Sequence, residues 1–218
     1  MKTGLIITGG SLDMAFAGWF LQKNKTDCVI SVDGGLERTK ALGLCPHAVV
    51  GDFDTVDREI LEEYRKKPGI LWNVHRPEKD ETDTELAVNT AIKLGCRRLF
   101  ILGATGGRLD HELSNLHLLK YCMDSKVEAF LYDRHNKVYL ICGKRAFQKK
   151  EVYGQYVSFI PMTEQVTGIT LTGFKYPLNH KTISMGAEAG LCVSNEIAEE
   201  EAEITLEQGI LICVESKD

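Results

Sequence analysis

Short apolar runs alternate with longer segments of helical character through about the first 130 residues. The apolar runs are nearly continuous, as in strands that are buried on both faces of a sheet. They lie at residues 5–8, 28–32, 48–50, 71–74, 99–102 and 127–132. Segments with helix start and stop residues lie between them, at 12–22 after Ser11, 36–42, 58–67, 83–94 and 111–123. This repeated βα rhythm predicts an α/β fold with a doubly wound, mostly parallel sheet flanked by helices.

From about residue 134 the pattern changes to short segments rich in β-branched and aromatic residues, with Gly and Asn between many of them. These segments lie at 138–142, 147–152, 156–160, 167–171, 182–185, 190–193, 202–206 and 210–214. We therefore expect two domains, an α/β domain at 1–133 and a smaller all-β sandwich at 134–218.

Composition narrows the class of protein. Of the 218 residues, 44% are hydrophobic and 26% are charged, which is typical of a soluble chain that forms a core and excludes a disordered or coiled-coil chain. The formal net charge of −5, without a basic stripe, disfavours a nucleic-acid partner. No apolar run reaches the roughly 18 residues of a membrane span, and no signal-peptide pattern follows the N-terminus. The seven cysteines show no C-x-x-C spacing and indicate reduced, mostly buried thiols. We expect a cytoplasmic protein with no nucleic-acid or membrane partner.

Carboxylates gather where four of the predicted strands end. The segments are Asp33-Gly34-Gly35, Gly51-Asp52-Phe53-Asp54, Lys79-Asp80-Glu81-Thr82-Asp83 and Gly103-Ala104-Thr105-Gly106-Gly107-Arg108-Leu109-Asp110. Because the carboxyl ends of parallel strands share one edge of a sheet, all four segments should converge on one rim. Clustered carboxylates stay ionised only with solvent, a basic partner or a divalent cation beside them. Magnesium fits best, since it takes oxygen ligands and binds through one or two carboxylates plus substrate phosphate.

The two aspartates of the second segment suit one ion. In an extended stretch, Asp52 and Asp54 would leave the same face with Cα atoms about 7 Å apart. The alternative is a polar turn with Asx hydrogen bonds.

The third segment fits a helix start. Thr82 and Glu85 form a capping-box pattern, which leaves Asp83 at the first helical position, where a carboxylate is stabilised and can reach a metal. In the first segment, Gly34 and Gly35 either let the backbone approach a ligand closely or form a plain tight turn.

The fourth segment carries an arginine. The planar guanidinium of Arg108 suits phosphate oxygens, although a surface arginine at a helix entrance is an equal alternative. The chain has neither a G-x-x-x-x-G-K-[ST] loop nor a G-x-G-x-x-G loop, so neither a P-loop enzyme nor a nicotinamide dehydrogenase is supported. A carboxylate-led site with arginine support indicates phosphoryl chemistry.

These motifs, in their order and spacing, resemble those of the thiamine pyrophosphokinases over nearly the whole chain. The matching segments are Asp33-Gly34-Gly35-x-x-Arg38, Gly51-Asp52-Phe53-Asp54-Thr55, Lys79-Asp80-x-Thr82-Asp83-x-Glu85, Gly103-Ala104-Thr105-Gly106-Gly107-Arg108-x-Asp110-His111 and Ser194-Asn195-Glu196. The resemblance implies transfer of a pyrophosphoryl group from ATP to the hydroxyethyl group of thiamine, giving thiamine diphosphate and AMP. It also implies magnesium and a homodimer with active sites between subunits.

The resemblance carries residue roles with it. Residues that would hold or surround magnesium are Asp33, Asp52, Asp54 and Asp83. Residues that would bind the nucleotide are Gly34, Gly35, Arg38, Lys79, Thr82 and Arg108. The catalytic group would be Asp83, Asp110 and Arg108, with the general base open between the two aspartates. Ser194 and Asn195 would meet the thiamine. Because Ile197 stands where an aromatic residue is expected, another aromatic side chain or an apolar contact would have to face the thiamine pyrimidine.

Two alternatives use the same residues. One is another magnesium-dependent phosphohydrolase or nucleotidyltransferase, and the other is a non-catalytic nucleotide-sensing module. Release of AMP that depends on thiamine would distinguish the first reading from both.

Overall fold

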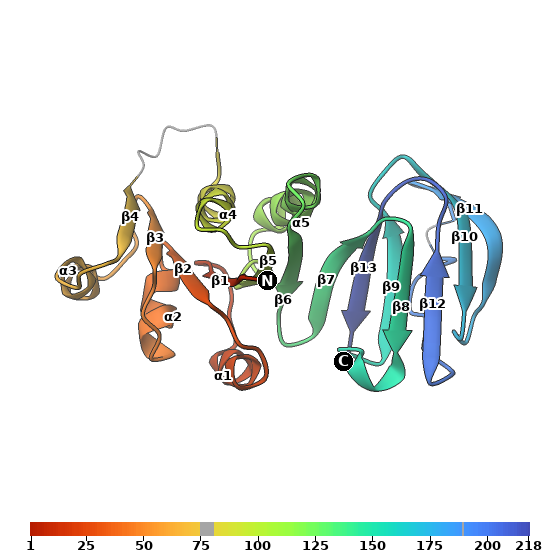
Figure 1. Cartoon of the computed structure of the whole chain (residues 1–218), viewed down its shortest axis with the longest axis horizontal. Helices are drawn as coiled ribbons and strands as arrows, with labels where there is room; N and C mark the ends of the chain where they lie inside the picture. The colour runs from red at the N-terminus through yellow and green to blue at the C-terminus, as the bar shows by residue number, and fades with distance from the viewer. Residues whose placement is uncertain (75–80, 189) are drawn as a thin grey trace. The chain divides into compact units, whose positions relative to one another are not determined.

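A computed structural model describes residues 1–74, 81–188 and 190–218 of the chain (Figure 1). The chain divides into two compact units, Met1–Arg134 and His135–Asp218. We refer to them as the α/β unit and the β unit.

The α/β unit is built on a parallel sheet. Its strands are β1 (Thr3–Ile7), β2 (Cys28–Val32), β3 (Ala48–Gly51), β4 (Leu71–Val74), β5 (Arg98–Leu102) and β6 (Glu128–Tyr132). They lie in the order β4-β3-β2-β1-β5-β6, and every pairing among them is parallel. The chain moves outward from β1 to β4 and then returns to the other side of β1, so a topological switch point lies between β1 and β5. The predicted doubly wound sheet is confirmed.

Five helices connect these strands in the described part of the unit. They are α1 (Met14–Lys23), α2 (Gly35–Ala41), α3 (Arg58–Arg65), α4 (Asp83–Lys93) and α5 (Leu109–Asp124). In Figure 1, α4 and α5 cover one face of the sheet and α1 and α2 cover the other. The predicted cap of α4 is confirmed, because the Thr82 Oγ1 accepts a hydrogen bond from the Glu85 N–H at 3.2 Å. The predicted start of α1 after Ser11 is wrong, because Asp13 caps the helix instead, accepting from the Phe16 N–H at 2.9 Å.

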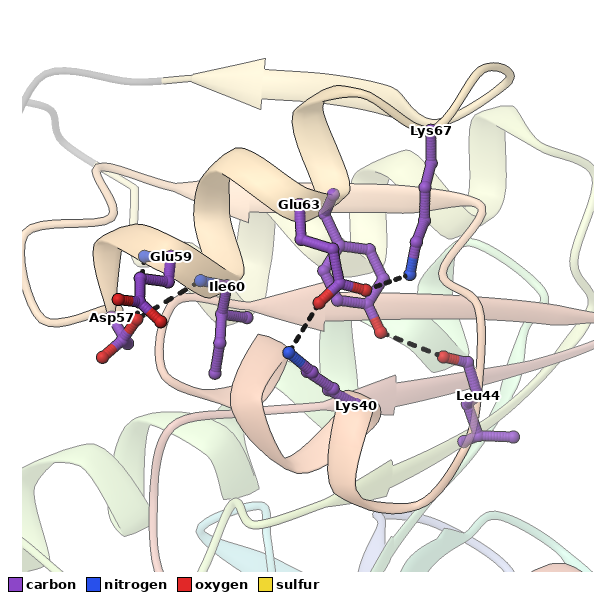
Figure 2. Close-up of polar contacts among 8 residues, drawn as sticks. Lys40, Leu44, Asp57, Glu59, Ile60, Glu63 and Lys67 are labelled. Atoms are coloured by element: carbon purple, nitrogen blue, oxygen red, sulfur yellow. Dashed lines mark hydrogen bonds and ion pairs between the residues drawn. The ribbon is translucent and has the colours of Figure 1, made fainter.

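Helix α3 is fastened to α2 by charged and polar contacts (Figure 2). Glu63 accepts from the Nζ of Lys40 at 2.6 Å and from the Nζ of Lys67 at 2.8 Å. Asp57 caps the first turn of α3, and the Tyr64 ring is buried beneath the helix with 1% of its surface exposed. These contacts fix the chain that follows β3, where the Asp52-Phe53-Asp54 segment lies.

The β unit contains two antiparallel sheets. Its strands are β7 (Asn136–Ile141), β8 (Lys144–Gln148), β9 (Tyr156–Pro161), β10 (Gln165–Thr172), β11 (Leu178–Ser184), β12 (Glu201–Thr205) and β13 (Leu211–Ser216). They lie in the orders β7-β13-β9 and β11-β10-β12-β8. The rings of Phe147 on β8 and Phe159 on β9 are 6.1 Å apart, and both contact Phe174 at 5.7 Å. The two sheets therefore pack through an aromatic core, which confirms the predicted sandwich.

Two predicted strands of this unit need correction. The segment at 190–193 forms turns instead of a strand, and the next β-pairings are single bridges, from Asn195 to Val157 and from Ile197 to Phe174. The predicted strand at 147–152 ends early, because β8 stops at Gln148 and residues Lys149–Glu151 form a 3-10 turn.

A buried polar cluster joins β7 to β13. Glu215 is 2% exposed, and one of its oxygens accepts hydrogen bonds from the Lys137 Nζ and from the Tyr139 hydroxyl, each at 2.8 Å. Its other oxygen accepts from the Tyr153 N–H at 2.7 Å. The carboxylate is therefore fully engaged inside the unit, as a buried charge requires.

The prediction for the cysteines is confirmed. All seven thiols are free, and five of them are buried, whereas Cys45 and Cys142 are exposed. In the described ranges, no helix is both long enough and apolar enough to cross a lipid bilayer.

Candidate active site

Three aspartates converge at the carboxyl ends of β2 and β3 and the start of α4. Asp33 follows β2 with a φ of 45° and is partly buried. Its pKa is raised to about 7, first by burial and then by the charges of Asp83 and Asp52. The Phe53 N–H, which donates to the Asp33 Oδ1 at 3.4 Å, opposes this rise. The predicted meeting of carboxylates from separate strand ends therefore holds for Asp33, Asp52 and Asp83.

Gly51 makes room for this group. Its φ is 143°, and a Cβ at this position would lie 1.7 Å from the Asp33 Oδ1. The carboxylate of Asp33 therefore lies directly against the end of β3, where a side chain on residue 51 would displace it.

The Asp52-Phe53-Asp54 segment is a turn, so the prediction of an extended stretch is wrong. Phe53 has a φ of 64° and is buried in an apolar cluster that includes Leu36 and Tyr64. The Asp54 N–H donates to the Asp52 Oδ1 at 3.2 Å, which is the Asx turn that the alternative reading expected. Burial of the phenyl ring turns the chain, and Asp54 is left exposed at the surface.

The loops after β1 and β5 meet beside this group. The Thr8 hydroxyl donates to the Gly103 carbonyl, and the Arg38 Nη1 donates to the Thr8 carbonyl at 2.8 Å. A Cβ on Gly10 would lie 2.1 Å from the Gly103 oxygen, so the two loops are in close backbone contact. Burial lowers the pKa of Arg38. Arg38, which was predicted to bind nucleotide, thus holds the loop at residues 8–11. The sequence reasoning missed this loop, although Gly9-Gly10 follows a strand just as Gly34-Gly35 does.

The two glycines at 34 and 35 have different surroundings. A Cβ on Gly35 would lie 2.1 Å from the Ile7 carbonyl oxygen, so the start of α2 needs glycine there to pack against β1. A Cβ on Gly34 would meet nothing within 4 Å. Of the pair, Gly34 is therefore the one with open space for a ligand.

Arg108 is presented at the end of the β5 loop. The loop is held by α5, because Glu112 accepts from the Gly107 N–H at 2.7 Å and the Asn115 Nδ2 donates to the Ala104 carbonyl at 2.9 Å. The guanidinium of Arg108 bonds to both oxygens of Asp110, at 3.1 and 2.6 Å. This hydrogen bonding lowers the pKa of Asp110 to about 2. Both side chains are mostly exposed, so the guanidinium lies where a phosphate can reach it.

Not every predicted site residue joins the aspartate group. In the described ranges, Arg108 and Asp110 pair with each other, and no three His, Cys, Asp or Glu side chains are arranged to hold a metal ion by themselves. Thr82 caps α4 through its hydroxyl oxygen. Lys79 lies outside the residues that the structure describes.

In the β unit, the side chain of Asn195 holds the backbone of Tyr176 and Glu196. It is 2% exposed, and its Oδ1 accepts from the N–H groups of Tyr176 and Glu196 at 3.0 and 2.9 Å. Its Nδ2 donates to the Tyr176 carbonyl at 2.8 Å. Ser194 beside it is exposed, with a φ of 56° and its N–H donated to the Ser158 hydroxyl at 2.9 Å. The Asn195 amide therefore positions the loop, and Ser194 faces solvent.

The Asn195 amide holds an exposed aromatic residue, Tyr176, that the sequence reasoning missed. Tyr176 is 57% exposed, and its backbone is held on both sides by the Asn195 amide. Ile197, at the position where an aromatic residue was expected, is buried and bridges to Phe174. The sequence signal was the Phe174-Lys175-Tyr176 run, in which one aromatic residue enters the core and the next leaves it.

Comparison with known proteins covers both units. Residues 21–131 match the family model for the thiamin pyrophosphokinase catalytic domain, and residues 146–211 match the model for the thiamin pyrophosphokinase vitamin B1 binding domain. The chain is 33% identical to the thiamine pyrophosphokinase of Bacillus subtilis, over 100% of both chains.

Solved structures of thiamine pyrophosphokinases have the same fold as this chain. The crystal structure of the Bacillus subtilis thiamine pyrophosphokinase superimposes with a TM-score of 0.86 at 30% identity, and both chains are covered completely. The Geobacillus thermodenitrificans enzyme gives a TM-score of 0.84 at 32% identity, over 100% of this chain and 98% of that one. The yeast enzyme, at 16% identity and a TM-score of 0.79, shares the fold. The resemblance inferred from the motifs is thereby confirmed along the whole chain.

Proposed function

Because the chain belongs to the thiamine pyrophosphokinase family, we propose that it transfers the pyrophosphoryl group of ATP to the hydroxyethyl oxygen of thiamine, giving thiamine diphosphate and AMP. The observation that carries this proposal is the convergence of Asp33, Asp52 and Asp83 at one rim of the sheet. An acidic group of this kind suits a cation, and the exposed Arg108 on the loop after β5 suits a polyphosphate.

The donor chemistry of the aspartates fits magnesium. The group offers carboxylate oxygens only, and burial followed by the charges of Asp83 and Asp52 raises the pKa of Asp33, so a dication would relieve an existing electrostatic cost. Asp33, Asp52 and Asp83 would hold the ion, with Asp54 next to them at the surface. When bound, magnesium supplies charge neutralisation on the phosphate oxygens and on the departing AMP oxygen. Because the described side chains do not complete a site alone, water and phosphate oxygens would supply the remaining ligands.

The phosphates would be held by backbone and cationic groups at the same rim. Gly34 and the 8–11 loop leave room for close approach, and Arg38 fixes that loop through the Thr8 carbonyl. Arg108 would exchange its bond to Asp110 for bonds to phosphate oxygens. Lys79 would be a second phosphate contact.

Transfer requires the thiamine hydroxyl to approach the β-phosphorus in line with the departing AMP oxygen, so positioning supplies much of the rate. Asp83 or Asp110 would accept the proton of that hydroxyl. In the β unit, Tyr176 would stack on the pyrimidine of thiamine and Ser194 would hydrogen-bond to it. We further propose that the chain works in the cytoplasm as a homodimer with active sites between subunits.

The direct test is product analysis with ATP and magnesium, with and without thiamine. We expect AMP and thiamine diphosphate in equal amounts, formed only when thiamine is present. Release of ADP or inorganic phosphate without thiamine would instead support another phosphohydrolase, and ATP binding without turnover would support a sensing module. Asp83→Asn should abolish turnover, whereas Asp124→Asn, at the end of α5 beside Lys120, should not.

A further inference from the structure

Two cysteines lie close together beside strand β1, near the amino-terminal ends of the parallel strands. Gly4 on β1 pairs in register with Cys28, the first residue of β2. A Cβ on Gly4 would lie 3.1 Å from the Cys96 Sγ and 3.5 Å from the Cys96 Cβ. In-register residues of a parallel sheet project to the same face, so Cys28 projects to the face on which Leu99 and Cys96 lie against Gly4.

The two thiols interact directly. A hydrogen bond between their side chains lowers the pKa of Cys96 and raises that of Cys28. Burial and the charge of Asp27 oppose the lowering at Cys96, whereas Lys2 and Arg97 add to it. Both residues are 0% exposed, so the two thiols form a buried pair on one face of the sheet.

We propose that Cys28 and Cys96 form a peroxide-sensitive thiol pair that closes into an intramolecular disulfide across strand β1. The two side chains are already in hydrogen-bonding contact, and closing the disulfide brings the sulfurs to a bond length of about 2.05 Å. Cys96 is the nucleophile, because the hydrogen bond with Cys28 stabilises its thiolate. It lies in the turn between α4 and β5, and Cys28 is the first residue of its strand, so local opening at this edge admits a molecule as small as hydrogen peroxide.

The chemistry balances with peroxide as the oxidant. The Cys96 thiolate attacks one peroxide oxygen, the O–O bond breaks, and Cys96 becomes a sulfenic acid while hydroxide leaves and takes up a proton as water. The Cys28 sulfur then attacks the Cys96 sulfur, the S–O bond breaks, and a second water leaves with the Cys28 proton. Two thiols and one peroxide thus give one disulfide and two waters.

Peptide mapping tests this on the full chain. The reduced protein is treated with hydrogen peroxide, alkylated and digested without reductant. We expect the Cys28 and Cys96 peptides to lose alkylation to the same extent, ahead of the buried Cys122, and to be recovered as one linked species that reductant separates. Cys28→Ser should leave a sulfenic acid on Cys96 that dimedone traps, and Cys45→Ser, at an exposed single thiol, should leave the linked species unchanged.

Two results would overturn the proposal. One is oxidation of Cys45 while both Cys28 and Cys96 remain fully alkylated, and the other is a linked peptide that joins either of them to a different cysteine. The mapping of the unsubstituted protein decides the matter even where a serine variant fails to fold.

Discussion

Replacing Asp33 by Asn should stabilise the ligand-free fold while removing activity. The carboxylate is partly buried beside Asp52 and Asp83, so its charge is unfavourable unless a cation is present. Asn keeps the shape of the side chain and an oxygen that can accept from the Phe53 N–H. Asn also tolerates the φ of 45° at this position. The substitution therefore removes charge with little change in packing.

The magnitude follows from the pKa of Asp33, which rises from 3.8 to about 7 on folding. Because the folded pKa lies above the unfolded one, the folded chain holds a proton that the unfolded chain has released. This contribution to stability is complete below about pH 4 and is lost as the pH rises through 7. Linkage sets an upper bound of about 4 kcal/mol, and screening by water together with the shared titration of the neighbouring aspartates reduces it. We expect Asp33→Asn to exceed the unsubstituted chain by about 1–2 kcal/mol in free energy of unfolding at pH 8.

The assay is urea unfolding in a chelator from pH 5 to pH 8. Both tryptophans, Trp19 and Trp72, lie in the α/β unit, so their fluorescence reports on the unit that holds the site. Asp54→Asn is the matched control, because Asp54 is exposed, and its free energy of unfolding should change by less than about 0.5 kcal/mol. Added magnesium should stabilise the unsubstituted chain more than Asp33→Asn. The reasoning is refuted if Asp33→Asn is no more stable than the unsubstituted chain at pH 8.

Three further predictions concern other parts of the chain. Tyr176→Ala should raise the KM for thiamine by about fivefold, as expected for a lost ring contact of about 1 kcal/mol, and leave the KM for ATP unchanged in steady-state assays. Asp110→Asn should tighten ATP binding by roughly two- to fivefold in calorimetry, because Arg108 no longer has a carboxylate to leave. Glu215→Ala should lower the free energy of unfolding by about 3 kcal/mol in urea titrations, because Lys137 loses the buried carboxylate that it bonds to.

Two of these predictions have a matched control variant, and the third has a contradicting outcome. Tyr176→Phe keeps the ring and should keep the KM for thiamine, and an equal rise in both Michaelis constants would mean that the ring does not face thiamine. Unchanged or weaker ATP binding by Asp110→Asn would show that the arginine is not held back by its ion pair. Glu203→Ala removes an exposed pair with Lys144 in the same unit and should cost less than about 1 kcal/mol, so a similar loss for Glu215→Ala would contradict the buried-charge argument.

The sheet of the α/β unit was predictable because its strands are buried on both faces. The predicted strand at 28–32 coincides with β2, and the Thr82 cap fixed the start of α4 at Asp83. The segment at 190–193 is also largely apolar but forms turns, because the buried amide of Asn195 and the left-handed backbone of Ser194 determine its path. Such tertiary contacts leave no periodic signal.

The site was predictable as a set of strand ends but not as a geometry. Parallel topology alone brings Asp33 and Asp52 to one rim. The turn at Asp52 arises because Phe53 inserts into a core cluster formed by neighbouring helices and strands of residues 36–72, and no local pattern shows how these elements pack together. Tyr176 was missed because its exposure depends on the amide of a residue 19 positions later.

The buried phenyl ring at position 53 means that the loop bearing Asp52 and Asp54 is shaped when the chain folds and not when an ion arrives. The conformational entropy of this loop is then lost during folding, so a cation binds to a preformed turn. Cavity-forming replacements in that apolar cluster, such as Val56→Ala, would consequently register as weaker cation affinity although they alter no oxygen donor.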